Sequence, residues 1–187
     1  MHLIAFHAEP LGWLAVAWHG RRVSALTLGH AAPDSAERAL RAAGYAGSST
    51  RALDQLAKRL QGYAAGEPDD FADVPLDLEA GTRFRRHVLL ACQRISYGQT
   101  RSYAELAAEV GSPGAARAVG NVMARNRIPI LIPCHRVLGC GGRMCGYSAP
   151  GGLATKRKLL AIERRSVGRA HPPADSTARR VASMTSL

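Results

Sequence analysis

Hydrophobic residues in the first thirty positions of the chain gather in short runs divided by turn-forming residues. The runs are Leu3–Phe6, Gly12–Trp18 and Val23–Leu28. Glu9-Pro10 and a basic segment separate them. Short apolar runs bounded by turn residues are typical of strands joined by tight connections. The pattern therefore predicts a small antiparallel sheet.

The hydrophobic spacing then changes to that of helices. We expect one helix near Asp34–Ala43 and another near Thr50–Tyr63. With the sheet, these helices form an N-terminal α/β domain over residues 1–78, whose role we expect to be structural support. The apolar positions that define the second helix are Leu53, Leu56, Leu60 and Tyr63.

Residues 66–80 have no sustained period and contain two prolines and six acidic residues, which is typical of an interdomain connection. A second domain should therefore cover residues 79–164. Residues 165–187 are basic and poor in apolar side chains, and we expect them to be a disordered tail.

The second domain opens with a helix that Thr82 can cap. We expect Cys92, within this helix, to be a core thiol. The apolar residues at helical spacing are Phe84, Val88, Ala91 and Ile95.

Two further helices follow in close succession. Ser102 and Glu105 form an S-x-x-E capping box, and Gly111 can end the helix just after Val110. Ser112-Pro113 then supplies an N-cap and a first-turn proline, so a second helix should begin at once. The tight joint predicts a helix-turn-helix.

The second of these helices should run from Pro113 to about Arg125, with Arg117 surrounded by small side chains. Such residues could let the helix pack tightly in a core, or let its backbone approach a DNA groove closely. The capped helix before it favours the groove-binding interpretation. The small residues are Ala115, Ala116, Ala118 and Gly120.

Residues Ile128–Ile132 form a short apolar run that should be a buried strand or extended segment. It leads into Cys134, which His135 and Arg136 follow directly. These neighbours could lower the pKa of the thiol, but adjacent side chains of an extended chain point in opposite directions. Contact between Cys134 and His135 therefore needs a turn or a water relay.

A last helix is expected at Leu153–Glu163.

The chain has a formal charge of +11, which suits a polyanionic partner such as DNA. No stretch approaches the roughly 20 uncharged apolar residues of a membrane helix, and no secretory leader is recognisable. We therefore expect a cytoplasmic protein without a membrane partner.

Three of the four cysteines, Cys134, Cys140 and Cys145, lie within twelve residues. A zinc site is one interpretation, but no pair has the C-x2-C spacing of common zinc sites. Disulfides are not expected inside a cell. We predict no metal and regard Cys140 and Cys145 as exposed and without a role.

The segment from Ile130 to Val137, Ile-Leu-Ile-Pro-Cys-His-Arg-Val, resembles the active-site signature of the O6-alkylguanine-DNA alkyltransferases, also called methylated-DNA–protein-cysteine methyltransferases. The resemblance runs in order from about Gly81 to Glu163. It also includes Ser102-Tyr103, Ala115–Gly120, Asn126, Gly146-Tyr147-Ser148, Gly151-Gly152-Leu153 and Lys156.

The resemblance implies a catalytic group of four residues. Cys134 would accept the alkyl group, His135 would act as base through a bound water, and Glu163 would orient the imidazole. Asn126 would brace the loop around the nucleophile. The substrate pocket would be formed by Tyr103, which would bond N3 of the guanine, and by Gly146, Tyr147 and Ser148, on the O6 side.

The implied partner is double-stranded DNA that contains O6-alkylguanine, and O4-alkylthymine is a further implied substrate. Arg117 would enter the base stack from the minor groove while the target base is flipped out. The product is a thioether, so a monomer should react once, without a cofactor. The residues expected to contact DNA are Arg117, Ala115, Ala116, Ala118, Gly120 and Arg136.

The implied fold class is α+β. The N-terminal domain would be ribonuclease H-like, with a small antiparallel sheet and helices. The C-terminal domain would be mostly helical and winged-helix-like, with the helix-turn-helix. Some relatives hold zinc in the N-terminal domain or carry an extra regulatory domain; residues 1–80 contain no cysteine, and we expect neither feature here.

The sequence departs from the family pattern at two places. Arg127 stands where proline is common, and Ala149-Pro150 looks like an insertion at the pocket lip.

Two alternative functions fit the sequence less well. A non-catalytic damage-recognition protein would lack the reactive Cys134. A Cys-His hydrolase would need an oxyanion hole, for which the sequence offers no signal.

Overall fold

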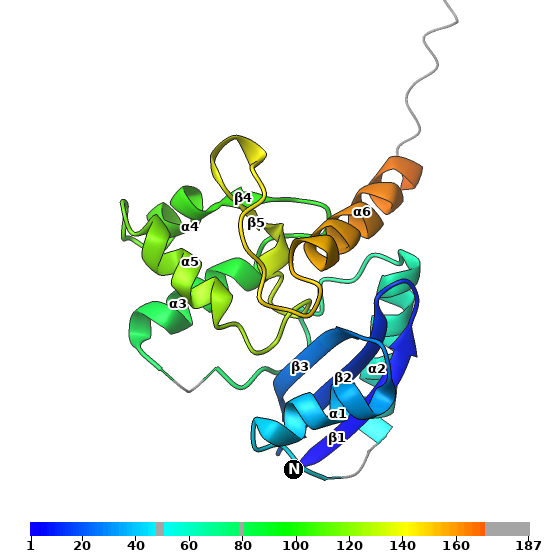
Figure 1. The fold of residues 1–187 in the computed structure, drawn as a ribbon. Helices are drawn as coiled ribbons and strands as arrows, with labels where there is room; N and C mark the ends of the chain where they lie inside the picture. The colour runs from blue at the N-terminus through cyan, green and yellow to red at the C-terminus, as the bar shows by residue number, and fades with distance from the viewer. Residues whose placement is uncertain (48–50, 79–80, 171–187) are drawn as a thin grey trace, which may run out of the picture.

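The computed structural model describes residues 1–47, 51–78 and 81–170 of the 187-residue chain. It is an α+β fold in which a small sheet with two helices is followed by a mostly helical part (Figure 1). Thr50 and residues 171–187, which belong to predicted elements, lie outside the described residues. No described helix is long and apolar enough to cross a membrane.

The N-terminal sheet is the one that the sequence predicts. Its strands are β1 (His2–Ala8), β2 (Gly12–His19) and β3 (Arg22–His30), antiparallel and in the order β1-β2-β3. Helices α1 (Pro33–Ala42) and α2 (Arg51–Ala65) follow, close to their predicted positions.

Both faces of this sheet are covered, because alternate residues of a strand point to opposite faces. Ala15 and Ala17 of β2 pack in a small cluster with Leu40 of α1. Leu14 and Val16 belong to the larger core, to which α2 contributes its apolar side. The larger core includes residues of both halves of the chain, from Leu14 to Leu159.

The connection predicted between two domains is packed against the rest of the chain. Phe71 and Val74 are buried in the core. The backbone of Val23 in β3 donates to the carbonyl of Pro75, and Asp77 donates back to Val23, each at 2.8 Å. This segment therefore extends the sheet edge and joins the two halves.

The first two helices of the C-terminal part begin where the capping residues predict. Thr82 caps α3 (Arg83–Gln93) by accepting a bond from the backbone of Arg85. In α4 (Tyr103–Glu109), the Ser102 hydroxyl accepts from the Glu105 backbone, while the Glu105 carboxylate accepts from Ser102. Gly111 ends this helix region with φ of 71°.

The prediction that a helix restarts at Pro113 is wrong. The next helix, α5, spans Ala116–Ala124. Gly114 has φ of 89°, outside the right-handed helical region, and the Ala115 amide closes a turn on the Ser112 carbonyl. The joint between α4 and α5 is therefore longer than the capping residues suggest.

The segment before the cysteine is buried, as expected, but it is not extended. Ile130 has φ of 71°, and the amide of Ile132 donates to the carbonyl of Ile128 at 2.9 Å. A short 3-10 turn, η1 (Cys134–Arg136), follows it. Strand β5 (Val137–Leu138) then pairs in parallel with β4 (Arg101–Ser102), a contact that the sequence did not predict.

The last helix is longer than predicted. A second 3-10 turn, η2 (Cys140–Gly142), precedes α6, which spans Leu153–Ala170 instead of ending at Glu163. The hydroxyl of Ser166 bonds the carbonyls of Ile162 and Gly66, which holds the extra turns against the end of α2. The predicted tail therefore does not begin at residue 165.

The shared core makes a prediction about stability. Leu53 of α2 is fully buried in it, so Leu53→Ala should lower the free energy of unfolding by about 2–5 kcal/mol. Urea unfolding followed by circular dichroism and by fluorescence should show one shared transition. Lys58→Ala, at an exposed position of the same helix, is the control. Two separate transitions would contradict a core shared by both halves.

Candidate active site

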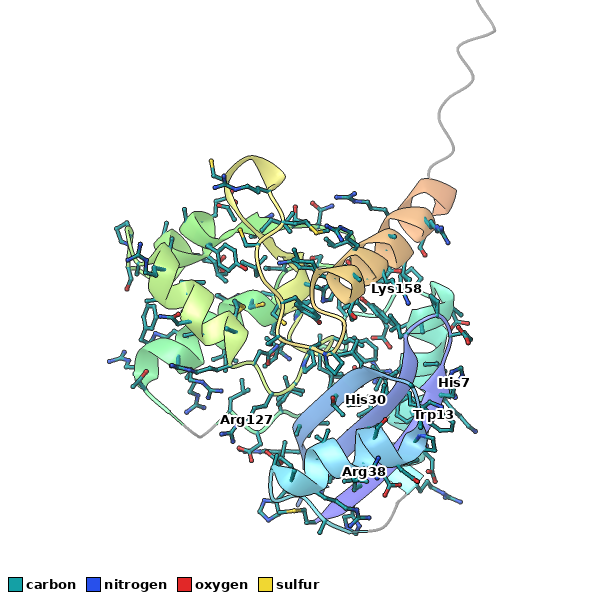
Figure 2. The ribbon with its side chains drawn as sticks, viewed as in Figure 1. His7, Trp13, His30, Arg38, Arg127 and Lys158 are labelled. Carbon is teal, nitrogen blue, oxygen red and sulfur yellow. The ribbon has the colours of Figure 1, made fainter. Side chains whose placement is uncertain are left out.

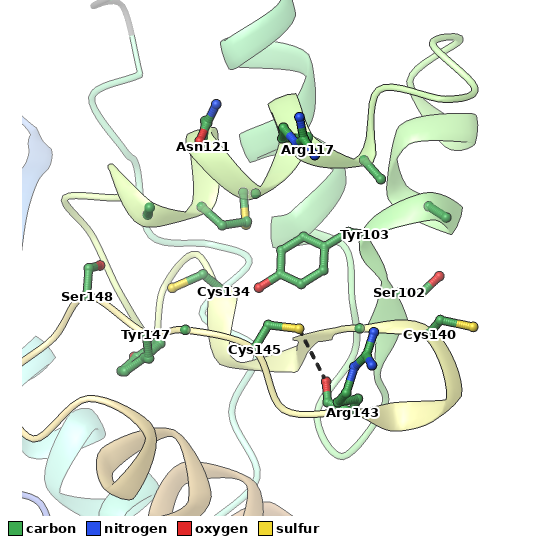
Figure 3. Close-up of a pocket in the computed structure, with 17 residues that line it drawn as sticks. Ser102, Tyr103, Arg117, Asn121, Cys134, Cys140, Arg143, Cys145, Tyr147 and Ser148 are labelled. Carbon is green, nitrogen blue, oxygen red and sulfur yellow. Dashed lines mark hydrogen bonds between the residues drawn. The ribbon is translucent and has the colours of Figure 1, made fainter.

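A cavity of about 940 Å³ lies between the start of α4, one side of α5 and the loop that follows β5. Figure 3 shows the Tyr103 ring directed toward Cys134, with Arg117 on α5 beside them. The lining includes eight residues of the predicted site. They are Tyr103, Ala116, Arg117, Gly120, Cys134, Gly146, Tyr147 and Ser148.

Cys134 stands at the start of the η1 turn, with 4% of its surface exposed. Its sulfur accepts a hydrogen bond from Asn126 Nδ2 at 3.2 Å. The same Nδ2 donates to the carbonyl of Ile132, and Asn126 Oδ1 accepts from the amide of Ile128. Asn126 thus holds both ends of the buried turn that leads to the cysteine.

Burial raises the pKa of the Cys134 thiol above its ordinary value. The hydrogen bond from Asn126, the charge of Lys156 and the nearby Tyr147 hydroxyl oppose this rise without reversing it. The idea that His135 and Arg136 lower the pKa finds no support, because their side chains bind Glu163 instead. The cysteine therefore rests as a neutral thiol and needs a base.

His135 is fully buried, and its Nε2 lies 2.8 Å from Oε1 of Glu163. An ionised carboxylate only accepts hydrogen bonds, so this contact assigns the ring proton to Nε2. Burial lowers the pKa of His135, so the ring is neutral. The other nitrogen, Nδ1, is buried without a hydrogen-bond partner among the described residues. Nδ1 is therefore free to accept a proton.

Glu163 is 1% exposed and lies at the centre of several donors. Burial by itself would raise its pKa, but the hydrogen bonds and charges of His135 and Arg136 outweigh burial and hold the pKa at about 2. The amide of Gly98 also donates to Oε2, at 3.0 Å. The carboxylate is therefore ionised in the folded protein.

Arg136 does not face the surface, and the prediction that it contacts DNA is wrong. It is 2% exposed, and its guanidinium binds Glu163 through Nε and Nη2. Its Nη1 binds Asp70 and the carbonyl of Ile95. A buried arginine needs such partners, and here they are all within the protein.

Lys156 is a buried cation close to the reactive sulfur. Its Nζ donates to the carbonyl of Val137 at 2.7 Å and lies 6.0 Å from the centre of the Tyr103 ring. Its charge opposes the rise of the Cys134 pKa. Residue-level reasoning missed this role, because a helical lysine is usually solvated; only the resemblance marked the position.

Tyr63 is the second residue whose position the sequence did not reveal. It was counted among the apolar positions of its helix, and it is indeed fully buried. Its hydroxyl, however, donates to Glu163 Oε1 at 2.6 Å. Helical spacing identifies a buried side chain but does not show what its polar end meets.

Tyrosine and cysteine side chains contribute to the polar lining of the cavity, together with serine, asparagine and arginine. Burial raises the pKa of Tyr103 to about 12, so its hydroxyl stays protonated and can donate. The Tyr147 hydroxyl is buried near the Cys134 sulfur, outside good hydrogen-bond geometry with any described residue. Cys140 and Cys145 also line the cavity; Cys140 is exposed, as expected, whereas Cys145 is only partly exposed.

The two predicted departures from the family pattern, at Arg127 and at Ala149-Pro150, both contact strand β3. Arg127 is exposed beside β3, and its carbonyl accepts from the amide of Leu26 at 2.8 Å (Figure 2). The carbonyl of Pro150 accepts a hydrogen bond from the Thr155 hydroxyl and lies against Gly29 of β3. The Ala149-Pro150 segment therefore packs the loop after Ser148 against the sheet.

Helix α5 has an inner and an outer side. Val119, Val122 and Met123 are buried, whereas Arg117 and Ala118 are exposed. Of the small residues, Ala118 is exposed, Ala116 and Gly120 line the cavity, and Ala115 packs against the core. Core packing therefore accounts for only one of them. An exposed helix side with small residues and one arginine can approach a nucleic-acid groove closely.

Comparisons with known proteins agree with this geometry. A family profile described as "6-O-methylguanine DNA methyltransferase, DNA binding domain" matches residues 83–165. A methylated-DNA–protein-cysteine methyltransferase of Mycobacterium bovis is 40% identical over 178 residues, which cover 90% of this chain and 93% of the relative.

Solved structures of Mycobacterium tuberculosis proteins have the same fold. Its O6-methylguanine methyltransferase is 38% identical with a TM-score of 0.72, covering 88% of this chain and 93% of that one. A structure of OGT in complex with DNA is 36% identical with a TM-score of 0.69, covering 89% and 94%. The chain belongs to the methylated-DNA–protein-cysteine methyltransferase family.

Proposed function

We propose that Cys134 accepts the alkyl group in the repair reaction of this protein. As a member of its family, the chain repairs DNA by irreversible, stoichiometric transfer of an alkyl group from O6-alkylguanine to its own cysteine. One observation supports the assignment above the others: the Cys134 thiol lines the cavity and directly precedes the buried His135, whose Nδ1 has no hydrogen-bond partner in the described part of the chain.

The reaction follows from the protonation states of these groups. His135 Nδ1 takes the thiol proton through a water molecule, and Glu163 stabilises the resulting imidazolium. The sulfur then forms a bond to the alkyl carbon, and the bond from that carbon to O6 breaks. The electron pair leaves with the guanine, whose N3 accepts a hydrogen bond from the protonated Tyr103.

Two properties of the reaction follow from its product. The product is a thioether at Cys134, which has no route back to a thiol in this site, so each molecule reacts once. No step requires a cofactor or a metal.

Gly146, Tyr147 and Ser148 form the wall on the O6 side, and O4-alkylthymine is a further substrate in this proposal.

The bound DNA is a duplex approached from its minor groove. Because O6 lies inside the base stack, the nucleotide must rotate outward, at a cost of a few kcal/mol. Arg117, exposed at the cavity, fills the gap. The small residues beside it allow close contact with the backbone, with little sequence readout. These residues are Ala115, Ala116, Ala118 and Gly120.

The finer structural assignments belong to the same proposal. Residues 1–78 form a ribonuclease H-like support domain, and residues 79–164 form a winged-helix-like catalytic domain. One chain supplies every proposed catalytic residue, so the monomer is the active form, and it works in the cytoplasm. Damage recognition without catalysis is the weaker alternative, because it gives no role to Cys134 and the His135–Glu163 pair.

The first test is the mass of the protein after incubation with a duplex that contains one O6-methylguanine. We expect a gain of one methyl group per chain, located at Cys134. Cys134→Ala should gain no mass but should still bind the damaged duplex, because the cavity is retained. Tight lesion-selective binding by the wild type without any mass gain would instead identify a recognition protein.

The role of Arg117 can be separated from the chemistry. Arg117→Ala should slow transfer from the methylated duplex by about ten-fold or more, because the flipped-out state loses the side chain that fills the gap. Transfer from the free base O6-benzylguanine should not change. Arg21→Ala, at another exposed arginine, is the matched control. Equal slowing with both substrates would contradict a role in base flipping.

The relay also predicts how transfer depends on pH. Since burial lowers the pKa of His135 below its ordinary 6.5, the ring stays neutral when the solution is mildly acidic. Transfer from O6-benzylguanine should therefore decline on acidification with a midpoint below 6.5. A decline centred at or above 6.5 would show that His135 is not the buried base.

A further inference from the structure

Tyr63 contacts both His135, the proposed base, and Glu163, from a distant part of the chain. It lies on α2, which packs against the N-terminal sheet, and its hydroxyl donates to Glu163 Oε1 at 2.6 Å. The same hydroxyl oxygen is 3.2 Å from His135 Nε2. Glu163 Oε1 is also the atom that binds Nε2. The three polar groups therefore form a closed triangle.

The direction of each hydrogen bond in this triangle is determined by charge. Glu163 is ionised and only accepts, so the hydroxyl proton of Tyr63 points to the carboxylate. Burial raises the pKa of Tyr63, so that proton is kept. The lone pairs of the Tyr63 oxygen then face Nε2, which suits a protonated Nε2. Tyr63 and Glu163 thus favour the same tautomer, the one with Nδ1 free.

The ring of Tyr63 is held in place by its neighbours. It packs against Phe71, with ring centres 5.8 Å apart, and edge-on against Tyr97, also at 5.8 Å. No part of the side chain is exposed. A ring fixed on two sides places its hydroxyl with little freedom, as a positioning group requires.

We propose that Tyr63 is a positioning residue for alkyl transfer, through which the N-terminal α/β part holds His135 and Glu163 in the arrangement that proton acceptance needs. The inference rests on the proposed function, because it assumes that His135 is the base. It also gives the N-terminal part a role in the reaction beyond support.

The test compares single-turnover alkyl transfer in Tyr63→Phe with the wild type. The variant keeps the ring and loses only the hydroxyl, and we expect transfer to slow by about three- to ten-fold, as for the loss of one hydrogen bond of typical net strength. The slowing should be equal for O6-benzylguanine and the methylated duplex. The Kd for the duplex should not change.

Tyr97→Phe is the matched control. The Tyr97 hydroxyl bonds Ser166 at 3.3 Å and does not reach the triangle, so its loss should change the transfer rate by less than about two-fold. A Tyr63→Phe rate within about two-fold of the wild type would overturn the proposal. Equal slowing in both variants would also overturn it, since that result indicates a general loss of packing.

Two further readouts separate positioning from stability. If Tyr63 acts through Glu163, adding Tyr63→Phe to Glu163→Gln should change the rate by less than about two-fold; fully multiplicative effects would overturn the proposal. Should Glu163→Gln fail to fold, the ¹⁵N chemical shifts of His135, which report its tautomer, test the proposal instead. They should show an unprotonated Nδ1 in wild type and Tyr97→Phe, and a mixture of tautomers in Tyr63→Phe. A wild-type ring signal in a slowed Tyr63→Phe would overturn the proposal.

The two levels of the hypothesis fail in different ways. If the wild type transfers no alkyl group, the proposed function is wrong. If the wild type transfers the group and Tyr63→Phe does so equally fast, only the role of Tyr63 is wrong.

Discussion

The rest of this structure depends on one buried negative charge, the carboxylate of Glu163. Removing a carboxylate from water costs several kcal/mol unless charged and hydrogen-bonding groups compensate for it. Here Arg136, His135, Tyr63 and the amide of Gly98 do so. These donors come from three separate segments, so the chain must bring α2, the loop after α3 and the η1 turn to α6 before the charge is stable. Stability and the active site therefore share the same contacts.

The same charge determines the chemistry of the site. The Glu163 carboxylate accepts a hydrogen bond from protonated Nε2 and so leaves Nδ1 of His135 as the basic nitrogen. Its charge can also stabilise the imidazolium that proton transfer creates. Cys134 is kept as a thiol by burial, which limits its reaction with other electrophiles. We infer that the cysteine becomes nucleophilic only when a substrate in the cavity allows the proton to leave as the sulfur attacks.

Elements with local signals were predictable from the sequence. The strands of the sheet and the caps at Thr82 and Ser102 depend on residues within a few positions of each other, and they lie where expected. The early start of α5 was wrong, because the left-handed conformation of Gly114 outweighs the Ser112-Pro113 signal. The extended form of Ile128–Ile132 was wrong because Asn126 bonds both ends of a turn there. Tertiary hydrogen bonds override local preference in such places.

The sequence by itself determined the strands of the N-terminal sheet, most helices and the residue that carries the proposed chemistry, since the Pro-Cys-His-Arg segment is contiguous and resembles a known signature. Only the tertiary structure decided which groups surround it. Arg136 follows the reactive cysteine in the sequence by two positions, yet it is buried on Glu163, whereas Tyr63 is 100 positions from Glu163 and touches it. Periodicity reports which side of an element is buried. The partner of a buried polar group depends on long-range packing, which no local pattern contains.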